Sequence, residues 1–186
     1  MPPPTPHPPT AAPSPWIVRF LALAPTGGRI LDLAAGGGRH TRLARARGFM
    51  VTAVDRDVSG LADLCADPAL EIVAADLEAA PWPFAGRRFE GVIVTNYLHR
   101  PLLPLLAAAV AENGVLIYET FARGNEAYGK PSNPDFLLAP GELLEAVKGA
   151  LTVVAYEHGT VDAPRPAVIQ RIAAVRTEGA VPPLPS

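Results

Sequence analysis

The sequence predicts an α/β fold, a doubly wound and mostly parallel sheet of seven strands that ends in an antiparallel hairpin. Short apolar runs rich in Val and Ile alternate with helical patterns over most of the chain, which is typical of parallel strands joined by helical crossovers. The last two apolar runs have only a loop between them, and this favours an antiparallel pair. With 186 residues, 49% of them hydrophobic, the chain can fill the core of one domain.

Seven segments have the composition of strands. Each is short, and the first five are as rich in apolar and β-branched residues as strands that are buried on both faces. The predicted strands are 29–33, 50–55, 70–75, 89–95, 115–120, 151–157 and 167–175. The last two form the expected hairpin.

Helical patterns fill the intervals between these strands. The predicted helices are 41–47, 58–66, 101–112 and 140–149. Local signals mark their ends: Asp57 precedes the second helix, while Gly48 and the pair Asn113-Gly114 follow the first and the third. Strand, helix and strand at this spacing favour right-handed crossovers.

Proline-rich segments flank the predicted domain, which we place at residues 16–177. Residues 1–15 are expected to be disordered and residues 178–186 to form a flexible tail, because their composition favours extended, solvated backbone. The first segment would also suit a proline-recognising partner. No apolar run approaches the ~20 residues of a membrane span, and the start of the chain lacks the basic region of a signal peptide. We therefore expect a cytoplasmic protein with no membrane partner.

Composition also narrows the classes of partner. The formal net charge of −2 gives no general electrostatic basis for binding a polyanion, so nucleic acid is disfavoured. The single cysteine, Cys65, excludes a disulfide framework and a zinc site built mainly on thiolates. We expect no metal, and the sequence makes no prediction about the oligomeric state.

Carboxylates end three consecutive predicted strands. Asp32 and Asp55 lie at the ends of the first two, and Asp76 directly follows the third. In open α/β sheets, ligands bind beyond the carboxyl ends of the strands, where the strand order reverses. After Asp32 the chain continues as Ala-Ala-Gly-Gly-Gly, residues 34–38. A glycine-rich turn that opens a helix presents backbone N–H groups, which suit a carboxylate or a phosphate equally.

These residues resemble the class I methyltransferases that use S-adenosylmethionine (SAM). The segment "ILDLAAGGG" is similar to the first motif of that family, and the similarity extends from about residue 16 to residue 175. The run "GGGRHTRLARARGFMVTAVDRD" resembles the small branch that includes thiopurine and tellurite-resistance methyltransferases. The resemblance implies a Rossmann-like methyltransferase fold and SAM as the cofactor. One departure is visible, since Ala34 stands where the family has its first glycine.

The resemblance also implies roles for individual residues. The glycine-rich turn would cradle the methionine portion of SAM, Asp55 would accept the ribose hydroxyls, and Asp76 would face the adenine amino group. The expected cofactor-binding residues are Asp32, Ala34, Gly36, Gly38, Arg39, Asp55, Arg56, Asp76, Leu77 and Thr95. Structural alternatives stay open: Asp32 would then bind the N–H groups of the turn, Asp55 would cap a helix, and Asp76 would begin a turn.

The residues themselves favour SAM over a nicotinamide dinucleotide. The third glycine of the dinucleotide motif is missing, because Thr41 stands at its position. Asp32 would repel a pyrophosphate but attract the amino or sulfonium group of SAM. The chain also has little room for the second substrate-binding region that a dehydrogenase needs.

Candidates for the chemistry follow the fourth predicted strand, in the segment "TNYLHR". His99 and Tyr97 are the expected catalytic residues, and His99 alone has an ordinary pKa suited to proton transfer near neutrality. The polar loop 121–139 is too long for a simple connector, and we expect it to cover the substrate. The expected substrate-binding residues are Asn96, Arg100, Glu119, Arg123 and Lys130.

Leu98 is the apolar residue in this segment and should pack inward. Trp16, ahead of the first strand, suits either a lid over the cofactor or the core. The sequence predicts a SAM-dependent methyltransferase that acts on a small molecule. The alternatives are an RNA or protein methyltransferase and a SAM-binding protein without turnover. The segment lacks the Asn/Asp-Pro-Pro-Tyr/Phe stretch of enzymes that methylate amino groups of nucleic acids.

Overall fold

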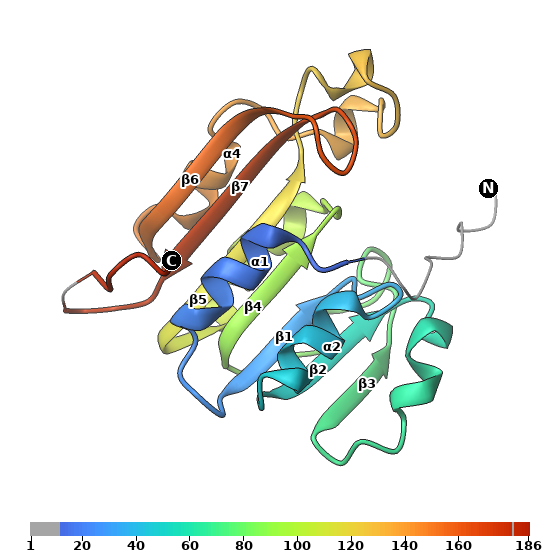
Figure 1. Cartoon of the computed structure of the whole chain (residues 1–186), viewed down its shortest axis with the longest axis vertical. Coiled ribbons are helices and arrows are strands. Elements are labelled where there is room, and N and C mark those ends of the chain that lie inside the picture. Colours follow the sequence, from blue (N-terminus) through green and yellow to red (C-terminus); the bar gives the residue numbers. More distant parts are fainter. Residues whose placement is uncertain (1–11, 180) are drawn as a thin grey trace.

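A computed structural model of the chain describes residues 12–179 and 181–186. Its centre is one seven-stranded sheet with the strand order β3-β2-β1-β4-β5-β7-β6 (Figure 1). The strands are β1 Arg29–Leu33, β2 Met50–Asp55, β3 Leu70–Ala74, β4 Phe89–Thr95, β5 Val110–Phe121, β6 Thr152–Val161 and β7 Ala167–Val175. Strands β1 to β5 pair in parallel, and β7 is antiparallel to both β5 and β6. The predicted fold, including the terminal hairpin, is confirmed.

Helical segments connect the strands and cover both faces of the sheet. The α-helices are α1 Pro15–Phe20, α2 Arg39–Ala46, α3 Leu103–Ala109 and α4 Glu142–Val147. The 3₁₀ helices are η1 Leu21–Leu23, η2 Ser59–Leu64, η3 Arg100–Leu102, η4 Asn125–Ala127 and η5 Pro134–Phe136. Helices α1 and α2 lie on one face, whereas α4 lies behind the hairpin on the other (Figure 1). In the described part of the chain, no helix is long and apolar enough to cross a membrane.

Two apolar clusters form the core, one on each face of the sheet. The first contains side chains of α1, α2 and Ile30 of β1. The second contains side chains of α3, α4 and Leu31 and Leu33 of β1. Successive side chains of a strand point to opposite faces, so Asp32 points to the face of Ile30, toward α2. Trp16 is 4% exposed and belongs to the first cluster. Of the two positions that the sequence allowed for it, a lid over the cofactor or the core, the structure shows the core.

The prediction of a helix at 101–112 is wrong for its last three residues, 110–112. Helix α3 ends at Ala109, and Val110 begins β5 by pairing with Phe89 of β4. A register shift between Phe89 and Gly91 accommodates the additional residues of β5. Pairing with a neighbouring strand thus outweighs the helical propensity of this alanine-rich segment. The predicted helix at 58–66 is also shorter, and it is the 3₁₀ helix η2.

The N-terminal segment contributes a helix that the sequence patterns did not predict. Ser14 caps α1 by accepting the N–H of Trp16 at 3.2 Å, and Pro15 occupies the first position of the helix. Proline suits this position because its fixed φ matches the helix and its missing N–H would have no helical partner. The prediction of disorder covers residues 1–15. Residues 1–11 of that segment lie outside the described residues.

The long loop 121–139 has a defined base beyond the end of β5 (Figure 1). The N–H of Leu138 donates to the carbonyl of Phe121 at 3.0 Å, and the N–H of Arg123 donates to that of Leu138 at 2.9 Å. Helices η4 and η5 lie within the loop. Its two ends are therefore closed by backbone hydrogen bonds at the carboxyl edge of the sheet.

Candidate cofactor and substrate site

The turn between β1 and α2 follows a path that favours glycine. Ala34, Gly36 and Gly38 have φ values of 55°, 54° and 75°. A side chain at Gly38 would also lack space, because a Cβ atom there would lie 2.3 Å from the Leu61 side chain. The left-handed conformation is unfavourable for residues other than glycine. Ala34 therefore adopts a backbone conformation that favours glycine, at an energetic cost.

Asp32 is a buried carboxylate directly below this turn. It is 2% exposed and accepts a hydrogen bond from the Thr41 hydroxyl of α2 at 2.6 Å. Burial raises its pKa from the usual 3.8 to about 6, although hydrogen bonds from Thr41 and the charge of Arg39 oppose the rise. A buried carboxylate without an ion pair lowers the stability of the folded protein, and such groups are often found at functional sites.

Asp55 joins the end of β2 to the glycine-rich turn. Its Oδ2 atom accepts the N–H of Gly36 at 2.8 Å, and its Oδ1 atom accepts the N–H of Asp57 at 3.0 Å. Asp57 in turn accepts the N–H of Ser59 at the first residue of η2. The hydrogen bond at the start of η2 thus comes from Asp57 and not from Asp55, whose carboxylate lies at the glycine-rich turn.

Asp76 lies after β3 and organises the loop that follows. Its Oδ1 atom accepts the N–H groups of Glu78 at 3.0 Å and Ala79 at 3.2 Å. The neighbouring Leu77 is buried in the cluster on the α3 and α4 face. Asp76 therefore does begin a turn, as the structural alternative supposed, and it does so at the edge that carries Asp32 and Asp55.

His40, in the first turn of α2, connects the glycine-rich turn to the N-terminal segment. It is 2% exposed, and its Nε2 atom accepts the N–H of Ser14 at 3.1 Å. Its Nδ1 atom lies 3.3 Å from the hydroxyl of Thr95 at the end of β4. Because Nε2 accepts, the neutral ring carries its proton on Nδ1. Burial, aided by the charge of Arg39, lowers its pKa to about 3, so the ring is neutral at pH 7.

Ser14 also contacts the end of β5. Its hydroxyl donates to Glu119 Oε1 at 2.8 Å, and Arg171 donates to Glu119 Oε2 at 3.2 Å. The Arg171 guanidinium lies 4.7 Å from the centre of the Trp16 ring. Glu119, which we expected to bind substrate, is thus engaged in holding α1. Sequence reasoning missed Ser14, although a serine followed by proline is a recognisable helix start.

Arg100 is engaged in a similar way on the other side of the site. Its guanidinium donates to both carboxylate oxygens of Glu142, at 2.7 and 3.1 Å. It also donates to the carbonyls of Asp135 at 2.7 Å and Leu137 at 2.9 Å. These contacts fasten the loop 121–139 to α4, so the structure gives Arg100 a role in shaping the loop. Arg123 and Lys130 are exposed on the same loop.

The segment after β4 brings the remaining candidates to this edge. Asn96 is exposed and has a φ of 54°. Leu98 is buried in the core, as predicted. His99 is partly buried and immediately precedes η3. Tyr97 is partly buried, and burial together with the carboxylates of Glu78, Asp76 and Asp55 raises its pKa. Its phenol therefore stays protonated at neutral pH.

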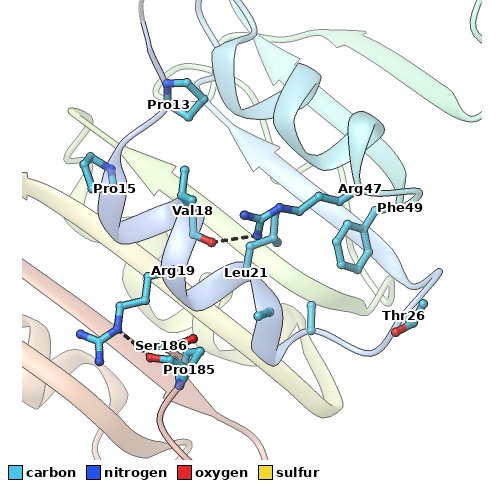
Figure 2. Close-up of a pocket in the computed structure, with 12 residues that line it drawn as sticks. Pro13, Pro15, Val18, Arg19, Leu21, Thr26, Arg47, Phe49, Pro185 and Ser186 are labelled. Carbon is cyan, nitrogen blue, oxygen red and sulfur yellow. Dashed lines mark hydrogen bonds between the residues drawn. The ribbon is translucent and has the colours of Figure 1, made fainter.

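A separate groove of about 840 Å³ lies beside α1. Val18, Phe49 and the C-terminal Pro185 are among the residues that line it, and Arg19 donates to the carbonyl of Pro185 at 2.8 Å (Figure 2). Phe49 precedes β2, so the groove is at the amino ends of the strands. It is therefore distinct from the edge that carries the three carboxylates. Among the described residues, no group of three His, Cys, Asp or Glu side chains is placed to hold a metal ion.

Comparisons with solved structures show the same fold in several methyltransferases. TehB from Haemophilus influenzae is 17% identical with a TM-score of 0.66, over 81% of this chain and 58% of that one. The 1,6-didemethyltoxoflavin-N1-methyltransferase of Burkholderia thailandensis, solved with S-adenosylhomocysteine (SAH), is 20% identical with a TM-score of 0.64. The match covers 88% of this chain and 76% of that one. The sequence matches no protein-family model and none of the curated proteins.

The fold by itself does not determine the reaction. The [4+2]-cyclase SpnF matches with 13% identity and a TM-score of 0.65, over 88% of this chain and 79% of that one. One architecture therefore carries both methyl transfer and a cyclisation among these structures, and the function of this chain has to be argued from its site. At these identities the comparisons show the fold, and the present chain spans little more than half of the TehB chain.

Proposed function

We propose that the chain is a SAM-dependent methyltransferase that acts on a small molecule. The observation that carries the proposal is the contact between the Asp55 carboxylate and the N–H of Gly36, which joins the end of β2 to the glycine-rich turn. Asp32 lies near the end of β1 and Asp76 lies just beyond β3, so the two strands next to β2 carry a carboxylate at the same edge of the sheet. The fold of solved SAM-dependent methyltransferases supports the same assignment.

The charges at this edge fit SAM. Three carboxylates suit a cationic ligand whose hydroxyl and amino groups donate hydrogen bonds, and they would repel a pyrophosphate. The proposed cofactor-binding residues remain Asp32, Ala34, Gly36, Gly38, Arg39, Asp55, Arg56, Asp76, Leu77 and Thr95. Asp55 is the proposed acceptor for the ribose hydroxyls. Its hydrogen bond with the N–H of Gly36 holds the carboxylate at the glycine-rich turn.

Bound SAM would supply an activated methyl group, so the task of the protein is to align the acceptor and exclude water. Alignment of this kind can lower the activation free energy by ~7–11 kcal/mol. His99 is the proposed base for an acceptor that must lose a proton, a contribution of about 10²–10⁴-fold. The loop 121–139, fastened by Arg100 and closed at its base, is proposed to cover the acceptor. Asn96, Arg123 and Lys130 are proposed to make polar contacts with the acceptor.

The alternatives differ in what they bind and whether they turn it over. An RNA methyltransferase would show affinity that falls steeply with salt, and the net charge of −2 argues against it. A protein acceptor would be methylated in a protein mixture but not among small molecules. A binding protein would take up SAM without releasing SAH. The single cysteine fits a reducing compartment, and a cytoplasmic location is part of the proposal.

Calorimetry with SAM and with SAH tests the cofactor. We expect both to bind, and we expect Asp55→Ala to weaken binding by more than ~1 kcal/mol, since hydrogen bonds to a charged group contribute about 1.5–3 kcal/mol. Asp162→Ala, an exposed position between β6 and β7, is the matched control and should bind normally. Absence of binding at millimolar concentrations would overturn the proposal. SAH release in the presence of candidate acceptors then separates an enzyme from a binding protein.

A further inference from the structure

Tyr97 has a buried hydroxyl that forms no hydrogen bond within the described part of the chain. The backbone around it is held firmly. The Tyr118 hydroxyl donates to the Tyr97 carbonyl at 2.7 Å, and the N–H of Asn96 donates to the carbonyl of Glu119 at 2.9 Å. Buried polar groups in native proteins almost always have a partner, and a missing one costs free energy of folding. This hydroxyl is therefore a donor that the described part of the protein leaves without an acceptor.

The surroundings of the Tyr97 phenol indicate which part of the proposed cofactor site is close to it. Its ring packs against the apolar cluster that contains Leu77 and Leu98. The carboxylates of Glu78, Asp76 and Asp55 are close enough to raise its pKa, in addition to the effect of burial. These groups belong to the loop after β3 and the end of β2. Tyr97 is thus near the carboxylates of the region proposed for adenosine, and its hydroxyl remains a donor at every physiological pH.

We propose that the Tyr97 hydroxyl donates a hydrogen bond to an acceptor atom in the adenosine half of the cofactor. This inference rests on the proposed function. Adenosine presents donors in its hydroxyls and amino group, and acceptors in its ring nitrogens. Asp55 and Asp76 can accept from the donors, but carboxylates cannot satisfy the acceptors. A neutral hydroxyl that stays protonated beside them supplies the missing donor. Tyr97 is then a cofactor-binding residue, in place of the catalytic role that the sequence suggested for it.

The test is the substitution Tyr97→Phe, which removes one oxygen atom and keeps the ring. The probes are SAH and 5′-methylthioadenosine, which keeps the adenosine half and lacks the amino acid. We expect the affinity for both probes to fall by about five-fold, the effect of losing one neutral hydrogen bond. We also expect the free variant to unfold at a higher temperature than the wild type, because the unpartnered hydroxyl is gone. Tyr128→Phe, at an exposed position of the loop, should change neither quantity.

The outcomes separate this inference from the proposed function. If wild-type protein binds neither SAM nor SAH, the proposed function fails and the inference fails with it. If the wild type binds SAH and Tyr97→Phe binds it equally well, only the inference is overturned. A loss of affinity for SAH with none for 5′-methylthioadenosine would place the hydroxyl on the amino acid half and would refute the adenosine assignment. Circular dichroism of each variant confirms that it is folded.

Discussion

Replacing Asp32 by asparagine is expected to stabilise the protein at neutral pH and to weaken SAM binding. The carboxylate is 2% exposed, and burial raises its pKa from 3.8 to about 6. That difference is about 2 pH units, and each unit corresponds to 1.36 kcal/mol. The charged form therefore costs the folded state about 3 kcal/mol. Asparagine keeps the shape and can still accept the Thr41 hydroxyl, without the charge.

The pH dependence of the effect is its signature. Below pH 3.8 the carboxyl is protonated in both folded and unfolded states, so its ionisation contributes nothing. Between pH 3.8 and about 6 the folded state holds the proton while the unfolded state releases it, and wild-type stability falls as the pH rises. Above pH 6 the full cost is present. The advantage of Asp32→Asn should therefore grow from pH 4 to pH 6 and then remain constant.

Urea unfolding at a series of pH values measures this difference directly. A constant offset between the two proteins from pH 4 to pH 8 would show that Asp32 has no raised pKa and would refute the reasoning. Asp162→Asn, at an exposed position, should show no such growth. Calorimetry with SAM tests the second part of the prediction, that Asp32→Asn binds SAM more weakly. If the variant is more stable and binds SAM as tightly as the wild type, the charge of Asp32 does not contribute to cofactor binding.

Three further substitutions test the frame of the site. Ala34→Gly should stabilise the protein by up to about 1 kcal/mol in thermal unfolding, because the left-handed φ of 55° is unfavourable for alanine; Ala35→Gly, whose φ is not positive, should destabilise it. Ser14→Ala should cost about 1–2 kcal/mol in urea unfolding, since it removes the cap of α1 and the hydrogen bond to Glu119; unchanged stability would mean that α1 is held by packing alone. Arg100→Gln should make the loop 121–139 more susceptible to proteases under native conditions, because the ion pair to α4 and two loop contacts are lost; an unchanged digestion pattern would contradict the fastening role.

The elements with strong local patterns were predictable from the sequence. Strands β1, β2, β4 and β7 begin and end where the apolar runs do. The antiparallel hairpin followed from the missing crossover, and the parallel strands placed Asp32, Asp55 and Asp76 at one edge. The reason is that hydrophobic periodicity and connection length are local properties, and in an open parallel sheet they largely determine which strand ends meet.

Tertiary structure decided what each polar side chain at that edge contacts. Glu119 and Ser14 are separated by 105 residues, yet their hydrogen bond seats α1 beside the site. Arg100 likewise binds Glu142 of α4, 42 residues away. Val110 became part of β5 because Phe89 of β4 was beside it to pair with. Contacts between residues so far apart in the sequence produce no periodic pattern in it. They depend on how the helices and loops pack against the finished sheet, which only the tertiary structure determines.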